Sequence, residues 1–531
     1  MQIEILDFGP AIISGRLREA GERPIRLQLL ADGIPLAGNW GIPAPDPGGQ
    51  TFRFNLSALW SYIGSQTRLQ IRANDITADL PAPTFADTPK FSLEDLRQKL
   101  ETGHVFNEKG KLQLSKTVDT VWQNSMFALF DGMSAILATR GLKLFVLYGT
   151  LLGAYRNGNF IGHDHDFDAG YISSHTDPAE VMAELVEVAE ALVEHGYRVS
   201  CKLSCIWVTD PKTNVTIDIF HTYFDEKGKL LLPFGICGVK HFTKSDFRGY
   251  AELDLAGRKV LAIADTRTLV ECIYGPHWKT PNPGHNWDLD RTEKYPEGYV
   301  KRYHRAKIHW SDYYAHNRKV LGPSSFAEFV SRSGHLRHHV VDVGCGNGRD
   351  SVYLGTVRPS VVGIDNCAAA IRVARSHAAS TSSPKAISRL LQTLFHKRPA
   401  LSFVQGDIAD PGTLAALLRT MRPSGAREGL TLYGRFLLHA ITRIQQDAFL
   451  DGAAKALRPG DTVAFEFRTD QDEPLQKKQK FDDRRFIRPA AIERQMTELG
   501  FQLLEREEGT GLSPYLGEDP HLCRLVFVKA G

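Results

Sequence analysis

The chain has 531 residues, a length that corresponds to about three domains at roughly 150 residues each. Hydrophobic residues make up 42% and charged residues 24%, a globular composition that excludes a disordered or fibrous chain. The 64 basic and 61 acidic residues give a net charge of +3. A protein built to coat nucleic acid normally carries a strong basic excess, so we expect no nucleic-acid partner.

Targeting and cysteine patterns point to the cytoplasm. The first residues contain no basic region followed by an apolar stretch, so we expect no signal peptide. No apolar run reaches the ~18 residues that a membrane-spanning helix needs. The seven cysteines are scattered without a Cys-x-x-Cys pair, which fits a reduced compartment better than a disulfide framework or a zinc site.

Residues 1–85 have the pattern of a small β domain. The segments 25–30, 51–56 and 67–71 partly alternate polar with apolar residues, which predicts strands. The Pro-rich stretch 80–90 follows as a linker. We expect a β-sandwich-like accessory domain that serves docking or carbohydrate contact, and a purely structural appendage is equally compatible with the pattern.

Residues 92–305 are expected to form a mixed α+β domain. A long helical pattern covers 115–139, and an apolar strand is predicted at 143–147. A glycine–threonine turn, Gly149-Thr150, is expected directly after this strand. The small residues of this turn would let a nucleotide phosphate approach the backbone, and Arg156 could neutralise another phosphate oxygen.

Three alternate aspartates follow in the same segment. On an extended chain, residues two apart project from one face, so Asp164, Asp166 and Asp168 can crowd their carboxylates together. Asp218 lies between isoleucines in another predicted strand, 216–220. Crowded carboxylates repel unless a cation neutralises them, and all-oxygen ligands suit Mg²⁺ or Mn²⁺.

We therefore predict that Asp166, Asp168 and Asp218 hold one or two metal ions that act on phosphate oxygens. The alternative interpretation is a solvated acidic loop, because Asp-x-Asp alone is common.

These residues resemble the signature of the LicD/fukutin family. Residues 149–156 and 163–168 carry the resemblance, together with Tyr274-Gly275-Pro276-His277-Trp278, and it covers about residues 115–290. The resemblance implies a nucleotidyltransferase-like fold and transfer of phosphocholine or polyol phosphates from CDP-linked donors to glycans. The sequence departs from the commonest family pattern at His163, which replaces a tryptophan, and at His165, which replaces an aspartate. Both histidines are interpreted as supporting or packing residues rather than zinc ligands.

A second glycine-rich loop opens the third predicted domain, residues 308–531. Gly344, Gly346 and Gly348 follow an apolar strand and permit positive φ and close ligand approach. Arg349 stands where the dinucleotide fingerprint needs glycine, which argues against NAD. The next strand ends in Asp365, where an acid can bind ribose hydroxyls.

This region resembles the class I S-adenosylmethionine-dependent methyltransferases, which have an α/β Rossmann-like fold. The resemblance implies that the three glycines line the methionine moiety, with Asp342 beneath it. It also implies that Asp365 holds the ribose and that Asp407 with Ile408 contacts the adenine. A fourth strand is expected at 431–439, and strands at 462–468 and 524–529 fit the closing hairpin of the family.

Candidates for the methyl-acceptor site lie after the fourth strand. His439 is a candidate general base, and Arg435 is a candidate residue for binding an anionic group of the acceptor. A histidine or arginine after a strand more often has a structural role. Tyr313 and Tyr314 could cap the cofactor or simply pack.

The basic amphipathic segment 384–398 could lie on an anionic membrane surface at the inner face of the cell membrane. Packing on its own domain is the favoured interpretation.

The sequence thus predicts a bifunctional enzyme of surface-polysaccharide synthesis (capsule, O-antigen or a teichoic-like polymer). One domain would transfer a phosphate-linked group from a CDP-type donor to a glycan or lipid-linked glycan, and the other would methylate the same product. Two alternatives stay open: a nucleotidyltransferase that releases pyrophosphate, and a methyltransferase that carries an inactive glycan-binding module.

Overall fold

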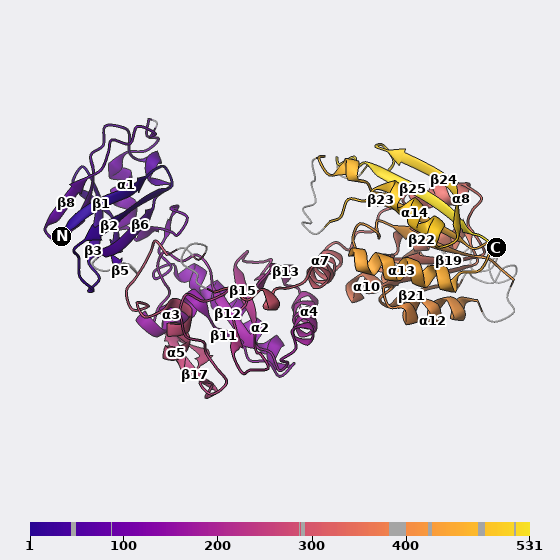
Figure 1. The fold of residues 1–531 in the computed structure, drawn as a ribbon, viewed down its shortest axis with the longest axis horizontal. Helices are drawn as coiled ribbons and strands as arrows, with labels where there is room; N and C mark the ends of the chain where they lie inside the picture. Colours follow the sequence, from indigo (N-terminus) through magenta and orange to yellow (C-terminus); the bar gives the residue numbers. More distant parts are fainter. Residues whose placement is uncertain are drawn as a thin grey trace. The chain divides into compact units, whose positions relative to one another are not determined.

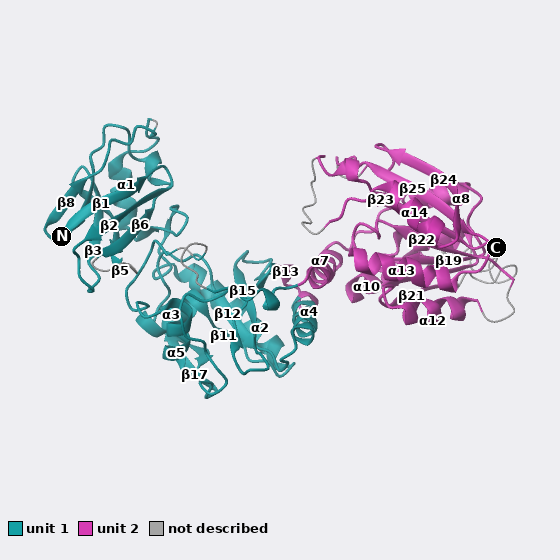
Figure 2. Ribbon diagram, viewed as in Figure 1, with its two compact units in different colours: residues 1–192, 202–300 teal, residues 193–201, 301–531 magenta. Residues whose placement is uncertain are grey.

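The structure is a computed structural model of the whole chain, and it describes residues 1–43, 49–86, 88–285, 287, 293–381, 400–422, 427–475, 484–514 and 517–531. The chain forms two compact units, shown in Figure 2. Unit 1 comprises residues 1–192 and 202–300, and unit 2 comprises residues 193–201 and 301–531. The predicted division into 1–85, 92–305 and 308–531 stays a prediction.

The N-terminal part of unit 1 consists of two four-stranded antiparallel sheets, labelled in Figure 1. One sheet has the order β1-β2-β6-β5 and the other β4-β3-β7-β8. Their strands are β1 (Gln2–Phe8), β2 (Ile12–Arg18), β3 (Arg26–Ala31), β4 (Ile34–Trp40), β5 (Ile42–Pro43), β6 (Gly49–Asn55), β7 (Leu69–Ala73) and β8 (Ile76–Asp79). The predicted strands at 25–30, 51–56 and 67–71 are confirmed as β3, β6 and β7.

Alternation of side chains explains these sheets. In β6, Gln50, Phe52 and Phe54 are buried, whereas the residues between them face outward. Inward residues of both sheets, such as Ile13, Leu29 and Phe52, belong to one hydrophobic cluster. Burial of apolar surface at about 25 cal/mol per Å² is the main force that holds the two sheets together.

The remainder of unit 1 is a mixed sheet with helices. Its elements are α1 (Leu93–Glu101), β9 (His104–Phe106), β10 (Leu112–Leu114), α2 (Thr120–Ala138), β11 (Phe145–Val146), α3 (Tyr148–Asn157), β12 (Asp168–Ile172), α4 (Pro178–Glu194), β14 (Cys205–Thr209), β15 (Thr216–Phe224), β16 (Leu230–Leu231), β17 (Tyr250–Leu255), β18 (Arg258–Ile263) and α5 (Thr266–Tyr274). Within the sheet the order is β11-β12-β15-β14, and β16 pairs with β15.

Two sequence predictions in this region need correction. The helix expected at 115–139 begins at Thr120, because the Asp119 side chain accepts a hydrogen bond from the Trp122 N–H and caps the helix there. The turn expected at Gly149-Thr150 is instead the first turn of α3, since the chain passes from β11 into this helix directly after Leu147.

Unit 2 contains a seven-stranded sheet of order β21-β20-β19-β22-β23-β25-β24. Its elements are β13 (Arg198–Cys201), α7 (Arg302–His316), α8 (Ser325–Arg332), β19 (His339–Val343), α9 (Arg349–Val357), β20 (Ser360–Asp365), α10 (Ala368–Thr381), β21 (Ala400–Gln405), α12 (Pro411–Met421), β22 (Leu430–Arg435), α13 (Arg443–Ala456), β23 (Thr462–Arg468), α14 (Pro489–Glu498), β24 (Phe501–Gly509) and β25 (Leu522–Lys529). The strands from β21 to β23 are parallel, and β25 is antiparallel to both of its neighbours.

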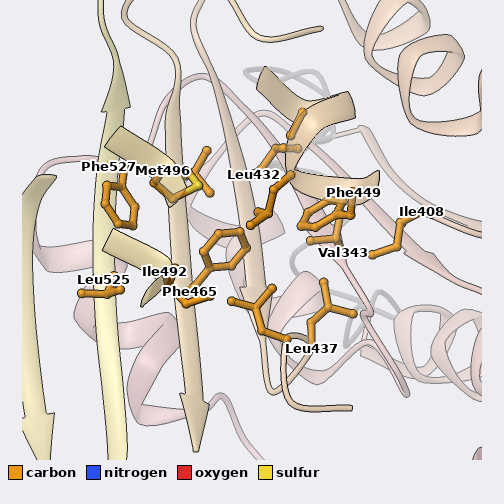
Figure 3. Packing of buried hydrophobic residues seen from close by; sticks show 14 of the residues in the cluster. Val343, Ile408, Leu432, Leu437, Phe449, Phe465, Ile492, Met496, Leu525 and Phe527 are labelled. Carbon is orange, nitrogen blue, oxygen red and sulfur yellow. The ribbon is translucent and has the colours of Figure 1, made fainter. Parts of the chain in front are cut away.

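The sequence predicted every strand of the seven-stranded sheet except β24, and it placed the end of one of them wrongly. The strand expected at 431–439 ends at Arg435, because Phe436 adopts a left-handed φ of 58° and turns the chain out of the sheet. Figure 3 shows the core beside this sheet, where Val343, Ile408 and Leu437 belong to one buried cluster.

Within the described ranges, no helix combines the length and the apolar character needed to cross a bilayer. The segment 384–398 lies outside the described residues.

Candidate active sites

The first site is a cluster of acids at one end of the neighbouring strands β12 and β15 of the mixed sheet in unit 1. β12 and β15 run parallel in a register that places Asp168 opposite Asp218. Asp164 and Asp166 lie on the segment that leads into β12, and the Asp166 N–H donates a weak hydrogen bond of 3.4 Å to Asp164 Oδ1. The strand pairing therefore brings together acids that are 50 residues apart in sequence.

The electrostatics of the cluster favour a cation. Burial and the charge of Asp166 raise the pKa of Asp164 to about 7, and the same two causes raise the pKa of Asp218 to about 7. Burial, with the charges of Asp164 and Asp218, raises the pKa of Asp168 well above its usual range. Each shift means that the ionised carboxylate is poorly compensated by the protein alone.

The first turn of α3 positions Asp168. The Gly149 N–H donates to Asp168 Oδ2 at 2.9 Å, and the Asp168 N–H donates to Thr150 Oγ1 at 2.9 Å. The two predicted donor-binding residues therefore both contact Asp168, and Thr150 is buried. Tyr148 begins this helix with a φ of 40°, a strained backbone conformation of the kind found at functional sites.

Glu108 belongs to this site although the sequence analysis did not identify it. His165 Nδ1 lies 3.0 Å from Glu108 Oε1, and His165 Nε2 lies 3.1 Å from Asp166 Oδ1. The bond to Glu108 raises the pKa of His165. Glu108 comes from the turn between β9 and β10, more than 50 residues before the aspartates, and no local pattern marks it.

The acids fit a hard divalent cation. Ligand atoms of Glu108, Asp164 and His165 lie within 4.8 Å of one another, the tightest such group among the described residues. The three predicted ligands, Asp166, Asp168 and Asp218, do not converge as closely, as expected for carboxylates that repel. Carboxylate oxygens dominate the donor set, so Mg²⁺ or Mn²⁺ suits it better than zinc.

A cavity of about 850 Å³ opens beside these acids. Its lining includes Asp164, Asp166, Asp168 and Asp218, with Gly149 at the end of α3. Arg156 and His163 also line it, whereas Thr150 and His165 do not. Its aromatic lining residues are Tyr148, Trp207, Phe234, Tyr274, Trp278 and Trp287. The cavity is large enough for a nucleotide-sized ligand.

Two of these lining residues have shifted pKa values. Arg156 lies in the last turn of α3 and donates to the Trp278 carbonyl at 3.4 Å, and burial lowers its pKa below the ordinary arginine value. Burial lowers the pKa of His163 to about 4, so this ring is neutral.

The second site is the glycine-rich loop after β19 in unit 2. Gly344, Gly346 and Gly348 all have positive φ, of 71°, 53° and 74°. The Gly346 N–H donates to Asp365 Oδ2 and the Cys367 N–H donates to Asp365 Oδ1, each at 2.9 Å. The loop is thus tied to the acid at the end of β20, and the assignment of Asp365 to the cofactor stays a prediction.

Two further predicted acids lie at or directly after the ends of neighbouring strands of the same sheet. Asp342 is buried in β19 and accepts a hydrogen bond from Ser351 Oγ, and burial raises its pKa to about 8. Asp407 follows β21 and accepts from the Tyr303 hydroxyl at 2.9 Å. Ile408 is buried in the cluster of Figure 3 and exposes 8% of its surface.

Helix α7 lies against the glycine-rich loop. A Cβ atom added at Gly346 would lie 2.9 Å from Tyr314 Cζ, so only glycine fits beneath this ring. Tyr303, near the start of α7, donates a hydrogen bond to Asp407, and Tyr314, near its end, packs against Gly346. Both ends of α7 therefore contact residues that the sequence analysis assigned to the cofactor. Of the two predicted capping tyrosines, both half-buried, Tyr314 is the one that lies against the loop, and desolvation raises the pKa of its hydroxyl well above the usual value.

His439 and Arg435, the two residues predicted at the methyl-acceptor site, both bond to other residues of the protein. His439 is buried, and its Nδ1 accepts a hydrogen bond from the Arg468 N–H at 3.1 Å, which occupies the lone pair that a base would need. Burial, together with nearby arginines, lowers the pKa of His439 well below its usual value. Arg435 forms an ion pair of 2.9 Å with the buried Glu466, so its charge is already compensated.

Comparison with known families gives two matches. Residues 141–260 match the family described as LicD/FKTN/FKRP, nucleotidyltransferase domain, and residues 335–388 match a methyltransferase domain. Both matches fall on the sites described above. The chain is therefore a fusion of a LicD-type domain with a methyltransferase domain.

A search of curated proteins gave no match. Among solved structures, the chain is similar to a SAM-dependent methyltransferase from Anabaena variabilis, with 16% identity over 42% of this chain and 93% of that one and a TM-score of 0.32. Magnesium protoporphyrin IX methyltransferase from Synechocystis with bound SAH matches at 14% identity over 39% and 80%, with a TM-score of 0.27. The N-methyltransferase NodS from Bradyrhizobium japonicum with SAH matches at 15% identity over 39% and 84%, with a TM-score of 0.28.

Proposed function

We propose that unit 1 transfers a phosphate-linked group from a CDP-type donor to a glycan, with a divalent cation held by its acids. The single observation that carries this proposal is the convergence of Asp164, Asp166, Asp168 and Asp218 on one cavity of about 850 Å³. A diphosphate donor is a multiply charged anion, and such a ligand needs positive charge beside these carboxylates.

The residues have distinct roles in this proposal. Asp166, Asp168 and Asp218 would hold Mg²⁺ or Mn²⁺, with Asp164 and Glu108 next to them. The cation would supply charge neutralisation for the diphosphate and for the leaving nucleotide phosphate. Gly149 holds the Asp168 carboxylate and Thr150 holds the Asp168 backbone N–H. Arg156 provides a positive charge inside the cavity for a phosphate oxygen.

Unit 2 would methylate the same product with S-adenosylmethionine as methyl donor. Gly344, Gly346 and Gly348 leave space for close approach, and Asp365 and Asp407 offer carboxylates for the ribose and adenine ends. The methyl group would pass from the sulfonium to a nucleophilic atom of the acceptor, and positioning would supply much of the rate. Fusion of the two domains raises the local concentration of a shared substrate.

Calorimetric titration of the full chain tests both halves. CDP-choline, CDP-glycerol and CDP-ribitol are titrated with and without Mg²⁺, and S-adenosylmethionine is titrated separately. We expect Mg²⁺-dependent binding of one donor that is lost in the Asp166→Asn/Asp168→Asn variant, while this variant binds S-adenosylmethionine as the wild type does. Donor binding that is independent of Mg²⁺ and of both aspartates would contradict the proposal for unit 1.

A matched variant tests the cofactor site of unit 2. Asp365→Ala removes the acceptor of the Gly346 and Cys367 N–H groups, and we expect it to lose S-adenosylmethionine while it keeps donor binding. Retention of S-adenosylmethionine affinity within twofold would contradict the assignment of Asp365.

A further inference from the structure

The N-terminal β domain forms part of the wall of the cavity in unit 1. Ile42 and Pro43 of β5, with Thr51, Phe52 and Arg53 of β6, line the same cavity as the aspartates. A detached structural appendage would leave no residue there. The domain therefore contributes surface to the site itself.

Hydrogen bonds fix this arrangement at the turn between β9 and β10. Asn55 Nδ2 donates to the Glu108 carbonyl at 2.8 Å, and Ser57 Oγ donates to the Lys109 carbonyl at 2.7 Å. The Ala58 N–H donates to the Gly110 carbonyl at 2.8 Å. Glu108 is the residue that contacts His165, so the β domain holds the very turn that reaches the acid cluster.

The backbone carbonyl of Arg53 is closely packed. The Asn39 side-chain amide donates to the Arg53 carbonyl. Gly284, another lining residue of the cavity, lies against the same carbonyl group, where an added Cβ atom would be 3.0 Å from the Arg53 carbonyl carbon. This close approach requires glycine at position 284.

The Arg53 side chain faces outward from β6, because its neighbours Phe52 and Phe54 point into the core of the β domain. Its Nε donates to Asn55 Oδ1 at 3.1 Å, and no described acidic side chain forms an ion pair with it. Two other arginines of this domain do have carboxylate partners: Arg18 pairs with Glu4, and Arg68 pairs with Asp79. Arg53 thus brings positive charge to a cavity that aspartates also line.

We propose that Arg53 binds an oxyanion of the substrate and that the N-terminal β domain is a substrate-binding part of the transferase site. This inference rests on the function proposed for unit 1. A guanidinium recognises phosphate and carboxylate through two parallel hydrogen bonds. The oxyanion belongs either to an acidic acceptor glycan or to the diphosphate of the donor, and the chemistry of recognition is the same in both cases.

The test compares binding of two kinds of probe to the full chain. The acceptor arm uses oligogalacturonate and oligomers of glycerol phosphate, with neutral dextran as the blank. The donor arm uses CDP-glycerol, CDP-ribitol and CDP-choline with Mg²⁺. Each titration is run on the wild type, Arg53→Gln, Arg53→Lys and the matched control Arg68→Gln, whose arginine lies on the other sheet.

We expect Arg53→Gln to weaken binding at least 10-fold in one arm, Arg53→Lys to restore part of it, and Arg68→Gln to stay within twofold of wild type. The arm that responds identifies the source of the oxyanion. Thermal unfolding should be unchanged in Arg53→Gln, because its side chain makes one hydrogen bond to a neighbour on the same strand.

Binding by Arg53→Gln within twofold of wild type in both arms, or absence of wild-type binding in both arms, would overturn the proposal. If the wild type binds an acceptor probe but none of the CDP-linked donors, the CDP-donor function proposed for unit 1 is wrong. The acceptor titrations then still test the role of Arg53.

Discussion

Replacing Gly149 by alanine places a methyl group among the carboxylates of unit 1. The added Cβ atom would lie 3.2 Å from Asp168 Oδ2, and it would lie well inside van der Waals distance of Asp164 Oδ2. Because ordinary contact distances are 3.4–4 Å, the Asp164 carboxylate must move by about 1 Å and the Asp168 carboxylate by a few tenths of an ångström. Gly149 is in the first turn of α3 with an ordinary helical backbone, so the strain falls on the acids and not on the helix.

Gly149→Ala is expected to change donor binding much more than it changes the free energy of unfolding. Alanine is favoured over glycine in a helix by about 0.5–1 kcal/mol, which offsets part of the steric cost. Displacement of metal-holding groups typically weakens metal binding by about 10–100-fold. We therefore expect Gly149→Ala to unfold within about 1 kcal/mol of wild type while Mg²⁺-dependent donor binding falls by at least about 10-fold.

The assay is a calorimetric titration of the CDP-linked donor with Mg²⁺, paired with urea unfolding. Gly452→Ala in α13 is the matched control, because a Cβ atom there meets its nearest neighbour at an ordinary 3.9 Å. Normal donor affinity in Gly149→Ala would refute the claim that Asp168, held against α3 and next to Asp164, is part of the cation site.

Three further predictions address the cation site, the cofactor loop and the core. The pKa values of Asp164 and Asp218 are raised to about 7, so the stability that their protonated forms contribute is lost as pH rises through 7. Because Mg²⁺ binds the deprotonated carboxylates, Mg²⁺ should raise the Tm more at pH 8 than at pH 5. An equal rise in Tm at both pH values would contradict this prediction. Gly346→Ala should abolish S-adenosylmethionine binding in calorimetry, since the position has a φ of 53° and no room for a methyl group, and retained affinity would contradict the cradle. Asp461→Ala should destabilise unit 2 by about 3 kcal/mol in urea unfolding, because it leaves Arg422 buried without its carboxylate partner at 2.7 Å. A decrease of less than about 1 kcal/mol in the free energy of unfolding would show that this ion pair contributes little to stability.

Local sequence patterns predicted the parallel strands and the glycine-rich loop of unit 2 well. The glycine loop and the acids at positions 365 and 407 each follow an apolar strand, and strand ends of a parallel sheet meet at one edge. The sequence was less successful with His439, because the expected strand continued to that residue. The left-handed Phe436 ends β22 earlier, and this conformation leaves no trace in hydrophobic periodicity.

Contacts between distant segments could not be predicted in this way. Asp218 was proposed beside Asp168 because an acid between isoleucines needs a partner, and the register of β12 and β15 places the two residues opposite each other. Glu108 and Arg53 reach the same cavity from a short turn and from the outer face of a separate sheet. Nothing in their local sequence distinguishes them from solvated surface charges, so only the tertiary structure assigns them to the site.

Analysis of the products formed from the donor tests the central claim most directly. The full chain is incubated with Mg²⁺, a CDP-linked polyol or choline, and glycerol at high concentration as a surrogate acceptor, and products are followed by ³¹P NMR. The account predicts release of CMP with formation of a new phosphodiester, and loss of both in Asp166→Asn/Asp168→Asn. Release of pyrophosphate when CTP replaces the donor in a parallel incubation, with CDP-linked donors left intact, would contradict phosphotransfer and establish a nucleotidyltransferase instead.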